Sequence, residues 1–121
     1  MKDCIFCKIV SGEIPCHKVY ENEKFLAFLS IEPESPGHTL VIPKEHYRWV
    51  WDVPEAGEYF EVSKKIALAQ KKAFDTDWVL SKVVGEEVPH AHIWVFPNDK
   101  VIGDKKDFET NAEKIRKELS K

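Results

Sequence analysis

Cysteine and histidine residues at ligand spacing are the first feature of this chain that could do chemistry. Cys4 and Cys7 form a C-x2-C pair, a spacing that lets two thiolates reach one tetrahedral ion. Zinc would need two further ligands, for which His46 and His90 are the natural candidates. Cys16 has no neighbour at ligand spacing, and we expect a packed thiol there. Because buried cysteines are common and inert, the pair alone leaves a zinc site and two packed thiols open.

Two further histidines flank a single alanine in a segment predicted to be a strand. Successive strand residues alternate between faces, so His90 and His92 are expected to point the same way, about 6.6 Å apart along the strand. Ala91, Ile93 and Val95 would then line the opposite face and could belong to the core. The bare pattern fits catalysis or metal binding, and equally a pair that only satisfies local hydrogen bonds.

Short apolar runs separated by turn residues predict an α+β fold with a mainly antiparallel sheet. Strands are predicted at residues 19–21, 25–29, 38–42, 78–84 and 88–96. Helices are predicted over the first ten residues, after an Asp52 cap with Pro54 in the first turn, and from Phe108 to Leu119. The middle helix is predicted to bury residues at three- and four-residue spacing, namely Tyr59, Ser63, Ile66, Ala67, Gln70 and Phe74.

Composition excludes several classes of protein. A chain of 121 residues is expected to form one domain, residues 1–121. With 18 basic and 21 acidic residues and a net charge of −3, nothing favours nucleic-acid binding. No apolar run approaches the roughly 18 residues of a membrane span, and the first seven residues lack the apolar core of a secretory signal. Three cysteines, an odd number, favour reduced thiols. Taken together, the charge, the apolar runs and the cysteines predict a cytoplasmic domain without nucleic-acid or membrane partners.

Several blocks of the sequence occur in the order seen in a known family. These blocks are Cys4–Pro15, Val19–Glu21, Phe25–Leu29, Pro36–His46 and Gly85–Ile93. Together they span most of residues 4–97, and on them the chain resembles the zinc-containing branch of the histidine-triad (HIT) nucleotide-binding proteins. The resemblance implies a five-stranded, mainly antiparallel sheet with a central helix and a C-terminal helix, usually paired in a homodimer.

The resemblance also implies an activity. Members bind a purine nucleotide or nucleoside phosphate derivative and hydrolyse or transfer it at the α-phosphate. The middle histidine of the family motif is the nucleophile, and that position is His92. A neutral imidazole, with a reference pKa near 6.5, can attack phosphorus without a separate base. A covalent nucleotidyl-histidine would divide one difficult displacement into two easier ones.

Position by position, the resemblance assigns ligands for zinc and for the nucleotide. A structural Zn²⁺ would be held by Cys4, Cys7, His46 and His90, a closed set with no open position. The base would lie among apolar residues, Phe6, Ile9, Phe28 and Ile31, with Ser30 near the ribose. Read without the family, the same apolar residues are typical of ordinary core.

The chain departs from the family pattern around the phosphate. Trp94 replaces the third motif histidine, and an indole can donate one hydrogen bond but cannot act as acid or base. Ser30 stands where an aspartate usually binds the ribose. The wall before Gly85 is short, and Glu86 and Glu87 follow it. A carboxylate about 5 Å from a phosphate would cost roughly 3 kcal/mol at an effective dielectric of 20. Either the two side chains point apart, or a protonated glutamate serves as proton donor.

Two functions therefore stand as hypotheses. The first is a hydrolase that cleaves a nucleoside phosphoramidate or a dinucleoside polyphosphate through His92, with Glu87 and Trp94 beside the phosphate. The second is a nucleotide-binding or regulatory protein that keeps the scaffold without efficient turnover. A transferase that passes the nucleotidyl group to a sugar phosphate fits less well, because the chain is short.

Overall fold

The computed structural model describes residues 4–121, and within them the chain forms one sheet with helices on both faces. Its five strands lie in the order β1-β2-β3-β5-β4, and every neighbouring pair is antiparallel. The strands are β1 (Lys18–Glu21), β2 (Phe25–Leu29), β3 (Thr39–Pro43), β4 (Val79–Val84) and β5 (His92–Pro97). The helices are α1 (Ile5–Ser11), α2 (Ala56–Ala73) and α3 (Phe108–Leu119), with a 3-10 turn η1 (Val50–Asp52) before α2. The predicted fold class is confirmed.

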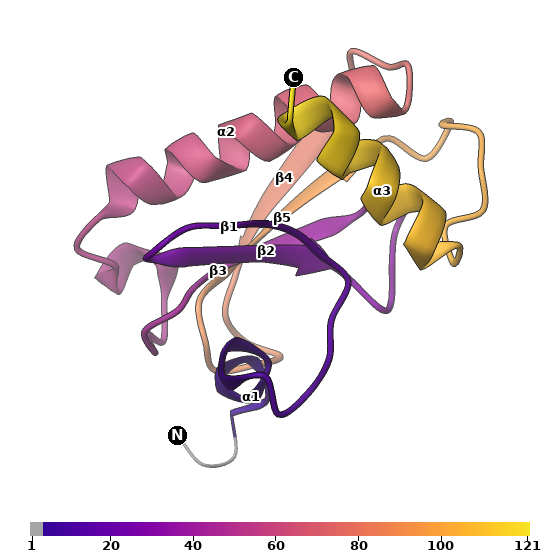
Figure 1. Cartoon of the computed structure of the whole chain (residues 1–121). Helices are drawn as coiled ribbons and strands as arrows, with labels where there is room; N and C mark the ends of the chain where they lie inside the picture. Colours follow the sequence, from indigo (N-terminus) through magenta and orange to yellow (C-terminus); the bar gives the residue numbers. More distant parts are fainter. Residues whose placement is uncertain (1–3) are drawn as a thin grey trace.

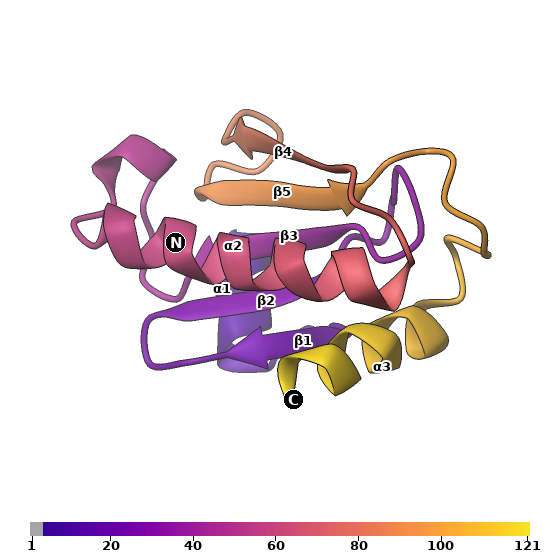
Figure 2. The ribbon, with the colours of Figure 1, turned by 90° about the horizontal axis from the view of Figure 1, so that it is seen from above.

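The sheet separates two apolar layers. Helices α2 and α3 cover one face, and the short helix α1 lies against the other (Figures 1 and 2). The larger core packs between the sheet and α2 and α3, and it contains Ala91, Ile93 and Val95, as expected. The smaller core joins α1 to the opposite face through Phe6, Phe28 and neighbouring side chains. Because β2 and β3 lie between these layers, all their residues are buried.

Polar side chains of α2 fix it to the sheet. The Tyr59 hydroxyl donates to the carbonyl oxygen of Val41 at 2.7 Å. The Gln70 amide donates to the carbonyl oxygens of Gly37 and Val95 at 2.9 and 2.8 Å. Each bond satisfies a buried backbone oxygen that would otherwise be costly to desolvate. These bonds fix the sheet to α2 on the face opposite to the one that α1 covers.

Several predicted boundaries are wrong, and two errors have clear physical causes. Asp52 does not cap α2; it ends η1, and α2 begins at Ala56. Pro54 favours an extended backbone at Val53, which has ψ 118°, so the chain leaves one turn before it enters the helix. The last strand begins at His92 instead of residue 88 because Pro89 and its neighbours form a bend. The first three residues of the predicted N-terminal helix lie outside the described residues.

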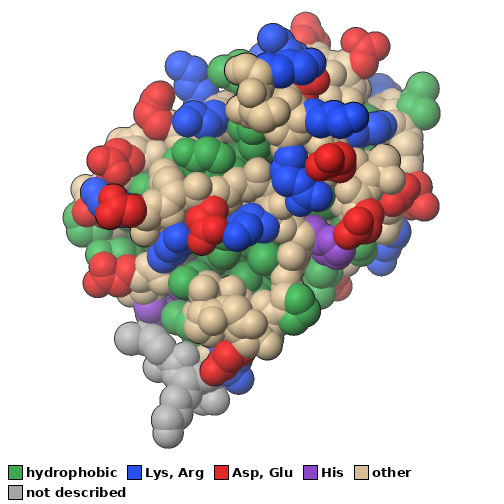
Figure 3. Space-filling view, in the orientation of Figure 1, with side chains coloured by type: hydrophobic (Ala, Val, Ile, Leu, Met, Phe, Trp, Pro, Cys, Tyr) green, Lys and Arg blue, Asp and Glu red, His purple; other side chains and the backbone are tan. Residues whose placement is uncertain are grey.

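On the face that Figure 3 displays, charged side chains of neither sign form a continuous patch. Acidic and basic side chains are interspersed there among apolar ones. In the part of the chain that the structure describes, no helix is long and apolar enough to cross a membrane.

Candidate functional site

The cysteine pair opens the first helix. Cys4 is the N-cap of α1, and its sulfur accepts a hydrogen bond from the Cys7 backbone N–H at 3.4 Å. The helix ends seven residues later, where Gly12 adopts a left-handed conformation with φ 87°. Because N-cap and third helical residues share one end of a helix, both sulfurs face the same point. The short helix therefore presents two thiols side by side to the sheet.

Two imidazoles meet these sulfurs from other elements. The ligand atoms of Cys4, Cys7, His46 and His90 all lie within 4.8 Å of one another. The Nδ1 atom of His90 is 3.3 Å from the Cys4 sulfur, and the Nδ1 atom of His46 is 3.3 Å from the Cys7 sulfur. A nitrogen at about 2.1 Å and a sulfur at about 2.3 Å from one tetrahedral zinc ion would be roughly 3.6 Å apart. The four side chains that the sequence proposed as ligands thus come together with suitable spacing.

The protonation chemistry of this cluster suits a dication. Burial lowers the pKa of His90 to about 4, so its ring is neutral at pH 7. Its Nε2–H donates to the carbonyl oxygen of Pro43 at 2.9 Å, which directs the Nδ1 lone pair toward the sulfurs. Burial and the neighbouring Cys4 together raise the pKa of Cys7 to about 11. The Cys7 thiol in such a place loses its proton readily only to a bound cation, and a sulfur and imidazole donor set fits zinc.

The two motif histidines are held by different backbone structures. His90 precedes β5 and lies in the bend, where its N–H donates to the carbonyl oxygen of Val88 at 2.7 Å. The prediction that a strand holds both histidines is therefore wrong for His90, because β5 begins at His92. Both rings nevertheless contact Phe6 edge to face, with centroids 5.8 Å and 5.1 Å away. They share the α1 side of the sheet, and only His90 belongs to the four-residue cluster.

The His92 ring has a defined tautomer. Its Nδ1 lies 2.8 Å from the carbonyl oxygen of His90. A carbonyl can only accept, so Nδ1 carries the proton and Nε2 keeps a free lone pair. Burial lowers the pKa of His92, which favours the neutral ring, although Glu87 and Glu86 partly oppose this shift. An unprotonated Nε2 is what a nitrogen nucleophile requires.

Trp94 has aromatic neighbours other than the His92 ring. Its indole packs against His38 and Phe96, with ring centroids 4.9 Å and 6.1 Å away. On its exposed side the ammonium of Lys82 lies over the ring, 4.7 Å from the centroid. In the described residues, the aromatic neighbour of His92 is Phe6.

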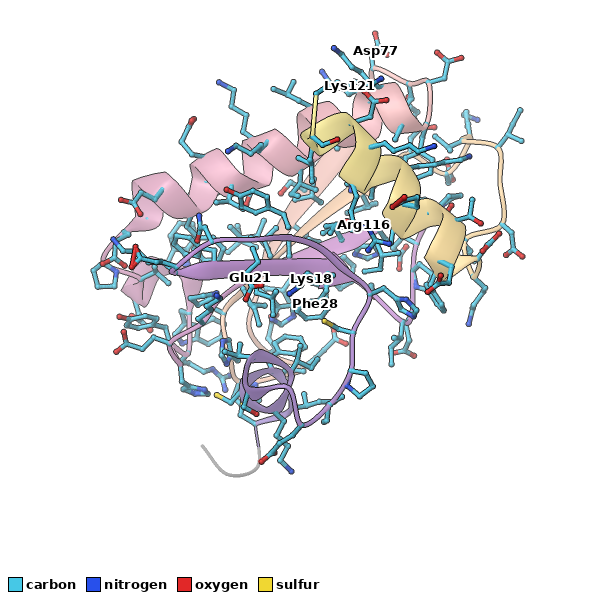
Figure 4. All side chains as sticks on the ribbon, viewed as in Figure 1. Lys18, Glu21, Phe28, Asp77, Arg116 and Lys121 are labelled. Atoms are coloured by element: carbon cyan, nitrogen blue, oxygen red, sulfur yellow. The ribbon has the colours of Figure 1, made fainter. Side chains whose placement is uncertain are left out.

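A pocket of about 690 Å³ opens beside His92, between α1 and the sheet. Figure 4 shows Phe28 projecting from the sheet toward α1. The pocket walls include every residue that the sequence analysis proposed for nucleotide binding, namely Phe6, Ile9, Phe28, Ser30, Ile31, Glu87 and Trp94. Apolar residues such as Phe6 and Phe28 therefore belong to the smaller core and also form part of the cavity wall.

Sequence reasoning missed part of this wall. Cys16 packs against the smaller core, as expected for a packed thiol, but it is only half-buried and also lines the cavity, as does His17. Two acidic residues of the loop after β2, Glu32 and Glu34, also line it. The signal that could have placed Cys16 and His17 is their position: they follow α1 after a few residues, so the chain must return along the helix.

The two adjacent glutamates have different surroundings. The Glu86 carboxylate accepts a hydrogen bond from the Gly85 N–H at 3.1 Å, which lowers the pKa of Glu86. Glu86 is thus a carboxylate, unsuited to donate a proton, and Glu87 is the one that lines the pocket. Gly85 itself packs against the Trp49 ring; a Cβ there would lie 2.7 Å from a ring carbon. The shortened wall is held by this close packing.

Comparison with known proteins places the whole arrangement. The family model described as the HIT domain matches residues 11–101, three-quarters of the chain. The chain belongs to the HIT family. A HIT-like protein of Methanocaldococcus jannaschii is 43% identical over 100 residues, covering 78% of each chain. An adenosine 5′-monophosphoramidase of Saccharomyces cerevisiae is 39% identical, covering 78% of this chain and 61% of the yeast protein.

A solved HIT structure has the same fold along nearly the whole chain. The zinc-bound histidine triad family protein of Mycobacterium smegmatis superposes with a TM-score of 0.86 at 34% identity, covering 98% of this chain and 94% of the other. The HIT family model thus accounts for the motif segment, and the structural match extends to α1, where the cysteine pair lies.

Proposed function

We propose that this HIT protein hydrolyses a purine nucleoside monophosphate derivative at its α-phosphate, with His92 as the nucleophile. One observation carries the proposal: the unprotonated Nε2 belongs to a ring that lines a nucleotide-sized pocket and takes no part in the cysteine and histidine cluster. The name of the yeast relative, an adenosine 5′-monophosphoramidase, favours a phosphoramidate over a dinucleoside polyphosphate.

The pocket offers a place for each part of such a substrate. The base would lie between the apolar side chains of α1 and β2, including Phe6, Ile9 and Phe28, with Ile31 at the entrance. The Ser30 oxygen accepts the Glu32 N–H at 3.2 Å, so its hydroxyl hydrogen remains for a ribose oxygen. One neutral hydrogen bond is weaker than the charge-assisted contacts of an aspartate, and ribose binding is correspondingly looser.

The chemistry would proceed in two displacements. The Nε2 lone pair of His92 attacks phosphorus, a phosphorus–nitrogen bond forms, and the leaving amine departs with its bonding electron pair and takes a proton from water. Water then attacks the same phosphorus, the bond to His92 breaks, and the nucleoside monophosphate is released. The His90 carbonyl oxygen would accept a hydrogen bond from Nδ1–H throughout and stabilise the positive charge that develops on the His92 ring.

We further propose that Cys4, Cys7, His46 and His90 hold a structural zinc ion. Four protein ligands leave no position for substrate, so the ion would stabilise the fold and supply no chemistry. Because His90 would be a zinc ligand and its carbonyl holds His92, the ion would also fix the orientation of the nucleophile.

Turnover and binding together test the proposed activity. With a fluorogenic adenosine 5′-phosphoramidate, we expect steady release of the amine and of AMP. Calorimetry with AMP and GMP should show binding to the same protein. The alternative, a nucleotide-binding protein without turnover, is motivated by Trp94 and by the carboxylate of Glu87 in the pocket. Binding without release of the amine would replace the hydrolase by that alternative, and absence of both would reject the two.

We also propose that two copies pair through α2 and the free edge of β4. β4 has a neighbour only on its β5 side in the described sheet, which leaves its other edge open. Apolar side chains are exposed nearby: Phe60 and Leu68 of α2 are 42% and 50% exposed, and Val83 of β4 is 40% exposed. Light scattering should give the mass of a dimer, and Leu68→Glu should shift it toward the monomer. Ile102→Glu, at a side chain that is 94% exposed outside these elements, should not. A monomeric wild-type protein would refute this pairing.

A further inference from the structure

We propose that Glu87 makes the pocket select its substrate by the charge of the leaving group. The favoured substrates would be nucleoside phosphoramidates whose leaving amine carries a separate positive charge, and the disfavoured ones would carry an anionic leaving group, such as a further phosphate chain. This inference rests on the proposed hydrolase function and deepens it.

The charges of the pocket wall are of one sign. Three carboxylates line the cavity, those of Glu32, Glu34 and Glu87, and the lining includes no lysine or arginine. A substrate phosphate therefore brings its negative charge into an already acidic cavity.

The cation on the neighbouring strand acts elsewhere. Lys82 lies over the indole of Trp94, and its charge contributes to the lowered pKa of Glu86. Glu86 also receives the Gly85 N–H, so its charge is compensated by two partners. Of the two adjacent glutamates, the one on the pocket wall, Glu87, is the one without this backbone hydrogen bond.

Glu87 and His92 line the same pocket. They lie five residues apart along the chain, Glu87 in the bend that precedes β5 and His92 at the start of that strand. No ion pair joins Glu87 to a lysine or arginine anywhere in residues 4–121. Whatever group leaves from the phosphorus atom attacked by His92 must therefore form near an unpaired negative charge.

The size of the effect follows from Coulomb's law. A unit charge about 6 Å away, at an effective dielectric of 20, changes an equilibrium or rate roughly a hundredfold. Glu87 is exposed, and salt and water reduce that figure. We expect about tenfold discrimination for each unit of charge on the leaving group. A polyphosphate leaving group carries several negative charges, and a simple amine carries none.

Three matched substrates test the inference. Each is an adenosine 5′-phosphoramidate of a three-carbon amine, ending in an ammonium group, a methyl group or a carboxylate. At low ionic strength kcat/KM should fall by about tenfold at each step in that order. Glu87→Gln should bring the three values within about threefold of one another, and Glu87→Lys should invert the order. Glu61→Gln, a control on the exposed face of α2, should keep the wild-type order.

The outcomes separate this inference from the function on which it rests. If kcat/KM varies equally over the three substrates in wild type and Glu87→Gln, or if the wild type prefers the carboxylate substrate, charge selection by Glu87 is wrong. In that case His92-dependent hydrolysis of the methyl substrate would still support the hydrolase. If none of the three substrates is hydrolysed, the proposed function and this inference are rejected together. Added salt should also reduce the differences in kcat/KM between the three substrates in the wild-type protein, because exposed charges are screened.

Discussion

Replacing His92 with alanine is expected to lower kcat/KM for an adenosine phosphoramidate by at least about 10⁴-fold. The substitution removes the only atom proposed to form a bond with phosphorus. The other imidazole on the pocket wall, His17, stacks on Phe108 of α3 with ring centroids 5.2 Å apart. His90 belongs to the cysteine and histidine cluster, and Trp94 carries an indole without basic nitrogen. Initial rates with the fluorogenic substrate measure the effect.

Two further variants distinguish loss of the nucleophile from loss of the folded structure. The His92 ring is 2% exposed and packs against Phe6, so alanine leaves a cavity. His92→Asn can retain the donor to the His90 carbonyl and should be equally inactive at nearly wild-type stability. His92→Gly should regain part of its activity when free imidazole is added, because the missing nucleophile is supplied. A loss of less than tenfold in both alanine and asparagine variants would show that another group performs the displacement.

Replacing Cys4 with serine is expected to remove zinc and to lower the free energy of unfolding by several kcal/mol. Structural zinc sites are coupled to folding, because the ligands converge only in the folded state. Cys4 contributes twice, since its sulfur also caps α1. Elemental analysis should give about one zinc per wild-type chain and almost none in the variant. Thermal unfolding should begin on the order of 10 °C lower.

Cys16→Ser is the matched control for this experiment. Cys16 is half-buried and lies outside the four-residue cluster, so its replacement should cost less than about 1 kcal/mol and leave the zinc content unchanged. Because the His90 carbonyl holds His92, the Cys4 variant should also lose turnover at temperatures where it remains folded. Absence of zinc from wild-type protein purified without chelators, with equal stability of the two serine variants, would refute the metal site.

The sequence predicts the sheet well where burial is uniform. The β-branched and apolar residues of β3, Thr39–Pro43, are all buried, and the short length, the β-branched residues and the terminal proline of this run indicate a strand. The alternation in β5 also predicts correctly that Ile93 and Val95 enter the core. Boundaries set by proline are harder, because Pro54 and Pro89 act on the backbone of their neighbours, and periodicity does not register that effect.

The candidate site was predictable in its residue types and only partly in its surroundings. The ordered motif blocks indicate the four cluster residues and His92 without any structure. The acidity of the pocket is different, because Glu34 and Glu87 are far apart in sequence and meet only through the order of the strands. The separate surroundings of Glu86 and Glu87 depend on one backbone hydrogen bond from Gly85, which no sequence pattern specifies.

The orientation of Trp94 decides whether the family chemistry remains available. An indole at this position could have covered the nucleophile, since both side chains project from the same strand face. Packing against His38 and Phe96 holds it aside, and the His92 ring remains a wall of the pocket. In the proposed mechanism, loss of the third histidine would therefore remove a polar contact without blocking Nε2 of His92.

Detection of the covalent intermediate tests the central claim most directly. Wild-type protein mixed briefly with an adenosine phosphoramidate would be denatured at alkaline pH, digested and analysed by mass spectrometry. We expect one adenylyl group on the peptide that carries His92, formed at least as fast as the substrate turns over, and none in His92→Asn. Steady turnover with no adduct at His92, or an adduct on a different residue, would contradict nucleophilic attack by this imidazole.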